Sequence, residues 1–339
     1  MHGQRNKERK QKLKKLLPFL FVMLFLVVVV LVFSKNADQK KVTEVTREKT
    51  ETQAEEVEEI HGIKCEKKKN IETYLFMGLD ATGKVKATDT YDGTGQCDTL
   101  QLVVFDHKNN TYTCLPINRD TMTDVKSLDE NGEVLGTTVM QISLAHATGD
   151  GLEESCENTV DAVSGLLYDQ VIDGYASLNM DAIVALNHLV GGVPVVINDD
   201  FSQVDDSLKV GETVKLTDEQ VMTFVRGRMD VGDGTNENRM KRQAEYLNAL
   251  KPILIKKCQE DQSFALEIYD ALEPYMVTSL SRNTFIKLAA NMMEYEEQDT
   301  LNIAGTNAIG RNEFNEFTVD EDSLADVVID LFYERLQEE

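Results

Sequence analysis

Polar side chains in the second half of the chain have the types and spacing of an anion-binding site. Arg226 and Arg228 end one predicted helix, and Arg239, Arg242 and Gln243 lie in the first turns of the next. The planar guanidinium of arginine donates paired hydrogen bonds to phosphate oxygens, and a glycine-rich loop that leads into a helix N-terminus adds backbone donors. The pattern therefore predicts a phosphate site. The alternative is that these arginines only neutralise the acids of residues 230–237.

A second group of charged residues is predicted at one edge of a sheet. Asp80 follows one predicted strand, Asp98 precedes the next, and Arg119 and Asp120 follow a third. If the turn between the last two strands centres on residues 108 and 109, paired positions sum to 217 and Asp98 lies opposite Arg119. Two carboxylates facing one space suit Mg²⁺, with water or phosphate completing its ligands. The alternative is that Asp80 and Asp98 are turn residues and Arg119 pairs with one of them.

Other catalytic motifs are missing from the sequence. Residues 78–85 (GLDATGKV) nearly match a nucleotide-binding P-loop, but Val85 stands where Ser or Thr must hold magnesium. No nucleophile elbow, zinc-protease motif or dinucleotide fingerprint is present, and the five histidines are scattered. The five cysteines lack metal-ligand spacing, and the hairpin register keeps Cys97 and Cys114 roughly 20 Å apart. A Ser/His/Asp triad, a zinc site and a disulfide framework therefore have no support.

The charged residues need elements to position them, and three short apolar strands come first. They are predicted at residues 72–78, 99–105 and 111–117, with a turn at 106–110. In an antiparallel meander, the end of the first strand, the start of the second and the end of the third meet at one edge. This arrangement would bring Asp80, Asp98, Arg119 and Asp120 together.

Helices are predicted to carry the arginines. Residues 217–220 (TDEQ) match a capping box that begins a short helix toward Arg226, and a glycine-rich loop at 230–235 precedes a long helix over about 236–257. Asn179 is predicted to cap another helix, which Gly191 ends before a strand at 193–197, and residues 322–336 form a closing amphipathic helix. We therefore predict an α/β fold, with a mixed central β-sheet flanked by helices.

The N-terminal part has the pattern of a membrane anchor. Residues 16–33 are apolar and uncharged, which is long enough for one transmembrane helix, and the basic residues of 1–15 predict a cytoplasmic tail. A cleaved signal peptide is the alternative, but no small-residue cleavage site follows. Residues 34–70 are predicted to form a stalk, and residues 71–339 one extracytoplasmic domain. We expect a single-pass protein of the cell membrane.

The charge of the chain argues against nucleic acid as a partner. The net charge is −24, and the first 33 residues carry seven basic residues and one acid, which leaves −30 for the remainder. Such a surface repels nucleic acid.

Six short segments, taken in order, resemble the LytR-CpsA-Psr family of cell-wall glycopolymer ligases. They are FMGLD at 76–80, CDTL at 97–100, LPINRDT at 115–121, GGVPV at 191–195, FVRGR at 224–228 and NRMKRQ at 238–243. Each segment alone is weak, but their common order behind a cytoplasm-in anchor is specific. The resemblance runs roughly from residue 71 to the C-terminus and is thinnest after Lys257.

The resemblance implies a phosphotransferase. Such an enzyme moves a glycopolymer, of teichoic acid or capsule type, from a polyprenyl-pyrophosphate carrier to a sugar hydroxyl of peptidoglycan, through a phosphodiester. By this resemblance Asp80 and Asp98 bind Mg²⁺, and Asp98, Arg119 and Asp120 are catalytic, with either acid as candidate acceptor of the hydroxyl proton. The pyrophosphate-binding residues would be Arg119, Arg226, Arg228, Arg239 and Gln243. An apolar channel for the polyprenyl tail is expected beside them.

Four positions depart from the family's usual pattern. Gln96 and Cys97 stand where Arg-Ser usually precedes Asp98, Asn118 replaces a proline before Arg119, and Gln141 stands where a lysine is often found. The lost positive charges favour an alternative function, that of a non-catalytic envelope sensor or binding protein for lipid pyrophosphate or wall polymer. A pyrophosphate hydrolase with water as acceptor is a further alternative.

Overall fold

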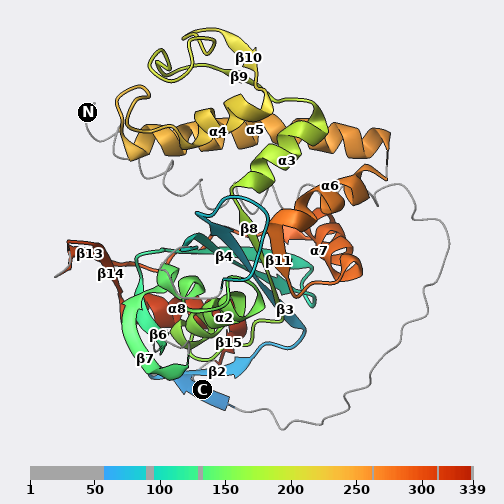
Figure 1. Cartoon of the computed structure of the whole chain (residues 1–339). Helices are drawn as coiled ribbons and strands as arrows, with labels where there is room; N and C mark the ends of the chain where they lie inside the picture. Colours follow the sequence, from blue (N-terminus) through green and yellow to red (C-terminus); the bar gives the residue numbers. More distant parts are fainter. Residues whose placement is uncertain (1–56, 89–94, 129–132, 262, 311–312, 337–339) are drawn as a thin grey trace, which may run out of the picture.

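A mixed six-stranded β-sheet forms the centre of the molecule (Figure 1). The computed structural model describes residues 57–88, 95–128, 133–261, 263–310 and 313–336. The sheet has the order β11-β8-β3-β4-β5-β12. Its strands are β3 (Ile71–Leu79), β4 (Cys97–Asp106), β5 (Thr111–Ile117), β8 (Gly174–Asn179), β11 (Met276–Thr278) and β12 (Glu296–Glu297). The predicted α/β class with a mixed central sheet is confirmed.

The predicted meander and its register are also confirmed. Strands β3, β4 and β5 are antiparallel neighbours, whereas β8 runs parallel to β3. Leu100 pairs with Ile117 and Asp106 with Thr111. Paired positions therefore sum to 217 along the whole hairpin, as predicted. The end of β3, the start of β4 and the end of β5 therefore lie at one edge, where the acidic residues were expected.

Helices cover both faces of the sheet because its strands are apolar on both sides. On β3, Tyr74 and Phe76 face one core, whereas Leu75 and Met77 face the other. The first core is completed by α3 (Asp181–Val190), α4 (Asp218–Arg226), α5 (Asn236–Glu260), α6 (Phe264–Leu272) and α7 (Arg282–Glu294). The second is completed by α2 (Glu153–Leu166) and α8 (Glu321–Phe332). Figure 1 shows the two helical layers on opposite sides of the strands.

Local signals in the sequence mark several helix ends correctly. The capping box of Thr217 and Gln220 is present at the start of α4, and Gly191 ends α3 in the left-handed conformation. Helix α5 begins at Asn236, with the Thr235 hydroxyl accepting from the Asn238 amide, and it continues to Glu260, slightly beyond the predicted end. The strand expected at 193–197 is β9 (Pro194–Val196), which belongs to a separate two-stranded sheet with β10 (Thr213–Lys215).

Two predicted segments differ from the structure at the ends of the domain. The C-terminal part of the expected stalk forms β1 (Val57–Ile60) and β2 (Ile63–Lys67), and β2 pairs with β15 (Tyr333–Arg335). The closing helix therefore ends at Phe332 rather than at residue 336. The cause is pairing between distant parts of the chain, which no local pattern reveals. The described structure thus includes ordered strands at 57–67, ahead of the expected domain start at residue 71.

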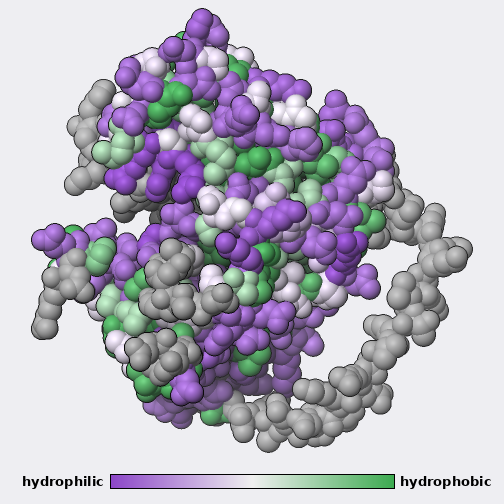
Figure 2. Space-filling model, viewed as in Figure 1, coloured by the Kyte–Doolittle hydropathy of each residue, from purple (hydrophilic) through white to green (hydrophobic). Residues whose placement is uncertain are grey.

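Two further hairpins extend from the domain, one of β6 (Met122–Leu128) with β7 (Val134–Gln141) and one of β13 (Gly305–Ile309) with β14 (Asn315–Val319). Most of the visible face is hydrophilic (Figure 2), in keeping with the acidic composition. The tail at 1–15 and the transmembrane helix predicted at 16–33 lie outside the described residues. Within the described ranges, no helix is both long and apolar enough to cross a bilayer.

Candidate active site

The predicted acidic and basic groups share one cavity. Its volume is about 960 Å³, and its lining comes from the ends of β3, β4 and β5, from α3 to α5 and from the β13–β14 hairpin. The predicted site residues that line it are Asp80, Asp98, Arg119, Asp120, Arg226, Arg239 and Gln243. Arg228 is the predicted site residue that does not contact this cavity.

Arg119 is the centre of the group at the sheet edge. Its Nη1 bonds the carboxylate of Asp98, and its Nε lies 3.5 Å from Asp120 Oδ1. Its Nη2 donates to Gln96 Oε1 over 2.8 Å. The register of β4 and β5 produces this contact, since Asp98 and Arg119 each lie two residues beyond the last pair, Leu100 with Ile117. The alternative in which Arg119 pairs with an acid is thus also met, but the pair lies in the cavity wall.

Asp80 and Arg226 join the sheet to the helical layer. Asp80 directly follows β3, and its backbone N–H donates to Gln96 O over 3.1 Å. Its Oδ1 lies 3.1 Å from Nη2 of Arg226, the last residue of α4. The two side chains are 52% and 42% exposed, so both groups remain open to a ligand.

Arg239 has the properties expected of an anion-binding residue. It lies in the first turns of α5, and its buried Nε has no hydrogen-bond partner among the described residues. Burial, and then the neighbouring guanidinium of Arg228, lower the pKa of Arg239. Arginine nevertheless stays protonated in proteins. A half-buried guanidinium beside like charges is costly, and an anionic ligand would offset that cost.

Arg228 therefore lies close to the site without lining it. Its side chain is exposed, and the loop that follows uses its acids for turns. Asp233 accepts from the backbone N–H and the hydroxyl of Thr235. No ion pair joins Asp230 or Asp233 to an arginine within the described ranges, and the side chain of Glu237, the third acid of that alternative, lies outside them.

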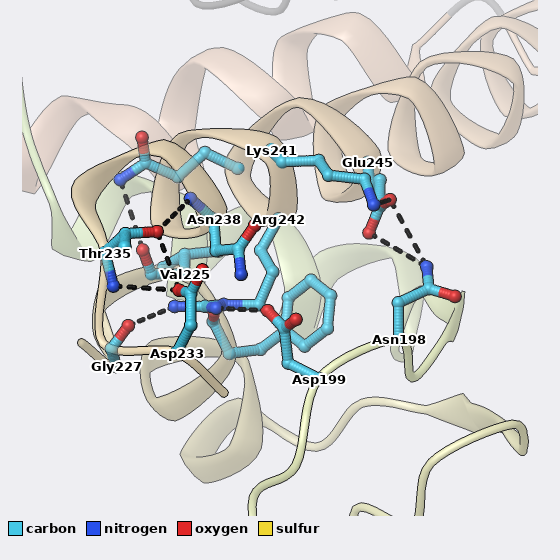
Figure 3. A network of polar contacts seen from close by, with 12 residues as sticks. Asn198, Asp199, Val225, Gly227, Asp233, Thr235, Asn238, Lys241, Arg242 and Glu245 are labelled. Carbon is cyan, nitrogen blue, oxygen red and sulfur yellow. Dashed lines mark hydrogen bonds and ion pairs between the residues drawn. The ribbon is translucent and has the colours of Figure 1, made fainter. Parts of the chain in front are cut away.

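Arg242 is a structural residue, although it belongs to the same helix as Arg239. Its side chain is 2% exposed and pairs with Asp199, while its Nε donates to the Phe224 carbonyl over 2.8 Å (Figure 3). It also bonds the Gly227 carbonyl, and its guanidinium lies 5.5 Å from the centre of the Phe201 ring. Arg242 thus satisfies carbonyls at the end of α4 and holds that end, with Arg226, against α5.

Gln243 also connects the two helices while it lines the cavity. Its Nε2 donates to the Val225 carbonyl over 3.1 Å, one residue before Arg226. The bond leaves the Gln243 Oε1 atom free to accept from a ligand or a water molecule.

Apolar side chains form another part of the cavity wall. They come from the start of α3, the end of α4 and the fourth turn of α5, and they are Met180, Ile183, Val225, Tyr246 and Leu247. A surface of this kind suits a hydrocarbon chain. The cavity therefore combines an apolar wall, a set of guanidinium groups and several carboxylates.

A smaller cavity of about 360 Å³ adjoins the first through Leu79, Asp80 and Arg226. Lys84 and His146 are among its lining residues. Burial lowers the pKa of His146 to about 4, so its ring is neutral at physiological pH, and its Nδ1 donates to the Gly95 carbonyl over 2.9 Å. Residues 80–88, which include most of the P-loop-like segment at 78–85, form no helix. This agrees with the rejection of a nucleotide-binding P-loop.

The cysteines cannot act as nucleophiles here. All five cysteines lie within the described residues, where none forms a disulfide and all are buried. Burial raises the pKa of Cys97, Cys114 and Cys156 to about 12 in each case. Thiols of that pKa are protonated at neutral pH and are poor nucleophiles.

A magnesium ion fits the acids only with help from a substrate. The described residues contain no group of three or more His, Cys, Asp or Glu side chains that can hold a metal. Asp80 and Asp98 contribute two carboxylates to one cavity, and an arginine contacts a single oxygen of each. Mg²⁺ keeps several waters and is often held by one or two carboxylates plus phosphate oxygens, which is the donor set that this cavity and a diphosphate would supply.

Sequence reasoning missed part of the lining. The missed residues are the amides of Asn118, Asn302, Asn307 and Asn315, the ring of Phe317, and the roles of Gln96 and Gln141. Gln141 Nε2 donates to Asp120 Oδ1 over 3.1 Å. In the sequence, the only indication of these lining residues was the departure of positions 96, 118 and 141 from the family pattern. Residues 302–317 showed no such indication.

Comparison with known proteins identifies a family and several relatives. The family model described as "LytR_cpsA_psr family" matches residues 28–331. "Biofilm regulatory protein A" of Streptococcus mutans is 30% identical over 189 residues, which are 53% of this chain and 43% of that protein. "Polyisoprenyl-teichoic acid–peptidoglycan teichoic acid transferase TagU" of Halalkalibacterium halodurans is 30% identical over 220 residues, 64% of each chain. The match thus spans less than two thirds of either relative's own length.

A solved structure supports the fold. The structure titled "TagT bound to LI-WTA" aligns with a TM-score of 0.50 at 22% identity and covers 78% of this chain and 90% of that one. At this identity the likeness concerns the arrangement of helices and strands alone.

Proposed function

The chain belongs to the LytR-CpsA-Psr family, and on that premise we propose that it transfers a glycopolymer from a polyprenyl-pyrophosphate carrier to peptidoglycan. The proposed donor is a lipid-linked polymer of teichoic acid or capsule type, and the acceptor is a sugar hydroxyl of the wall. The printed name of the TagU relative, a transferase of teichoic acid to peptidoglycan, supports this class of reaction.

One observation carries the proposal: the cavity offers a separate surface for each part of such a donor. The apolar wall from α3, α4 and α5 suits the polyprenyl tail, and Arg119, Arg226 and Arg239 suit the diphosphate. Arg239 is the strongest single support, because its guanidinium is partly buried among other arginines and its Nε is unpartnered within the described residues.

The proposed reaction is a phosphoryl transfer. The acceptor hydroxyl oxygen forms a bond to the phosphorus that carries the glycan, the bond from that phosphorus to the bridging oxygen breaks, and polyprenyl phosphate leaves. The hydroxyl proton goes to a carboxylate, for which Asp98 and Asp120 are the candidates. Such a reaction needs mainly positioning and neutralisation of charge, which the arginines provide.

Magnesium is part of the proposal. Asp80 and Asp98 would hold Mg²⁺, which would add positive charge at the diphosphate oxygens when bound. The arginines that contact these acids would stay beside the same oxygens. Arg228, which adjoins Arg239 without lining the cavity, is proposed to contribute long-range charge rather than a direct bond.

The proposed location is the cell membrane, with the domain outside the cytoplasm. The apolar residues 16–33 and the basic residues before them support one membrane crossing with a cytoplasmic N-terminus. This location would place the cavity where lipid-linked polymer and peptidoglycan meet.

A non-catalytic binding protein is the alternative that specific observations favour. Gln96 and Gln141 replace expected cations, and each bonds a central site residue, Arg119 or Asp120. The name of the Streptococcus mutans relative also describes a regulatory protein. A pyrophosphate hydrolase would use the same residues with water as acceptor.

One assay separates the three functions. The full-length protein in lipid nanodiscs receives Mg²⁺, a short polyprenyl-pyrophosphate glycan and peptidoglycan oligomers, and mass spectrometry follows the glycan. Glycan joined to peptidoglycan is the expected product. Free phosphorylated glycan would instead identify a hydrolase, and bound but unchanged lipid would identify a binding protein.

A further inference from the structure

The β13–β14 hairpin contributes an uncharged polar wall to the cavity. Asn307 lies directly across from Phe317, and Asn315 precedes Phe317 by two residues on the same strand. Side chains at such positions share one face of a hairpin, and all three line the cavity. Asn118 and Asn302 add two further amides beside this face.

These amides are available to a ligand. The side chains of Asn307 and Asn315 have no hydrogen-bond partner among the residues that the structure describes, and both are exposed. Each amide offers a carbonyl acceptor and an NH₂ donor, a combination that matches sugar hydroxyls and acetamido groups. The hairpin residues of this wall carry no charge, so it suits a neutral sugar better than a further phosphate.

The hairpin is held beside Asp120, one of the two candidate proton acceptors. The backbone N–H of Phe317 donates to the Asp120 carbonyl over 2.8 Å. Gln141 Nε2 donates both to the backbone carbonyl of Asn315, over 2.6 Å, and to Asp120 Oδ1. Gly305 allows the ring of Phe317 to lie against the strand, because a Cβ there would come within 2.5 Å of Phe317 Cζ. The amide wall therefore keeps a fixed place next to Asp120 and Arg119.

We propose that this amide wall, formed by Asn307, Asn315 and their neighbours, binds the first uncharged sugar of the donor, the one joined to the diphosphate. The inference rests on the proposed function. A sugar bonded to the diphosphate must lie next to the arginines that bind the diphosphate. Among the described residues, the uncharged polar wall at that place is the hairpin. The wall lies where resemblance to the family is thinnest, so it would set which polymer is accepted.

Binding of three probes to the full-length protein in nanodiscs tests the inference. The probes are farnesyl diphosphate, farnesyl diphosphate bearing one N-acetylglucosamine, and a peptidoglycan tetrasaccharide without lipid. The test variant is Asn307→Ala with Asn315→Ala. The control variant is Thr306→Ala with Thr318→Ala, a cross-strand pair on the opposite face of the same hairpin. All four positions are exposed, so thermal unfolding should be alike in the three proteins.

We expect the sugar-bearing probe to bind the wild type about tenfold more tightly than farnesyl diphosphate, since each amide hydrogen bond contributes modestly. The test variant should lose that difference and keep its affinity for farnesyl diphosphate, and the control should keep both. Equal binding of the two diphosphates by the wild type, or a loss confined to the tetrasaccharide, would overturn the inference and leave the proposed function standing. If neither diphosphate bound the wild type, both would be overturned.

Discussion

Arg226 Nη2 lies 3.1 Å from Asp80 Oδ1, although the two residues are 146 positions apart in the chain. Asp80 follows strand β3 of the central sheet, and Arg226 is the last residue of helix α4 in the covering layer. Their contact joins the acidic edge to the arginine cluster within one cavity, and it makes the two residues the first to test.

Arg226→Ala should lower transfer by roughly 10²-fold while the protein stays folded, because a lost charge stabiliser costs about this much in rate. The ion pair is half exposed, and such pairs contribute little to stability. Steady-state kinetics and thermal unfolding measure the two effects. Arg282→Ala is the matched control, since Arg282 forms a similarly exposed pair with Asp270 away from the cavity. Equal loss of activity in both variants would contradict a specific role for Arg226.

Arg239 and Arg242 should behave in opposite ways despite their places on one helix. Arg239→Ala should abolish measurable binding of farnesyl diphosphate and leave the free energy of unfolding nearly unchanged. Arg242→Ala should lower the free energy of unfolding by about 3–5 kcal/mol, because it leaves the carboxylate of Asp199 without its buried partner. Isothermal calorimetry and urea denaturation measure these changes. Tight diphosphate binding by Arg239→Ala would remove that residue from the site.

Removal of divalent metal should stop transfer if Mg²⁺ bridges the acids and the diphosphate. Chelation with EDTA should abolish product, and added Mg²⁺ should restore it. Asp80→Asn should raise the Mg²⁺ concentration for half-maximal rate by roughly tenfold, because an amide oxygen is a weaker ligand than a carboxylate. Asp270→Asn, which changes an acid that does not line the cavity, should leave the Mg²⁺ dependence unchanged. Full turnover in EDTA would exclude the metal.

Asp120 rather than Asp98 should accept the hydroxyl proton. The guanidinium of Arg119 contacts both carboxylates, but only Asp98 would also hold the proposed metal, which leaves Asp120 as the acceptor. Asp120→Asn should therefore remove the acidic limb of the pH profile of kcat. Asp98→Asn should reduce the rate without removing that limb. The reverse result would exchange the two roles.

Stability should fall below about pH 6.5 through His146. Burial lowers the pKa of His146 from its ordinary value of 6.5 to about 4, so between these pH values the unfolded chain binds a proton that the folded protein excludes. The free energy of unfolding should therefore decrease as pH falls through this window, by at most about 1.4 kcal/mol per pH unit from this group. Urea denaturation between pH 4 and 7 measures the slope. His146→Gln should show a smaller slope than the wild type, and an identical slope would contradict the assignment.

Short-range patterns were enough to predict the elements that carry the site. The turn after β4 determines the hairpin register, so Asp98 and Arg119 could be placed together from the sequence alone. The capping box at Thr217 and the glycine at position 191 likewise mark helix ends through bonds within a few residues. These features depend on local backbone geometry and side-chain periodicity, which a sequence displays directly.

Contacts between distant segments were decided only by the tertiary structure. Arg239 and Arg242 look alike in the sequence, yet only packing against the end of α4 buries Arg242 and leaves Arg239 toward the cavity. The pairing of β2 with β15 and the placement of the amide wall beside Asp120 arise in the same way. Local periodicity cannot specify which surfaces meet, because that choice depends on the combined burial of residues hundreds of positions apart.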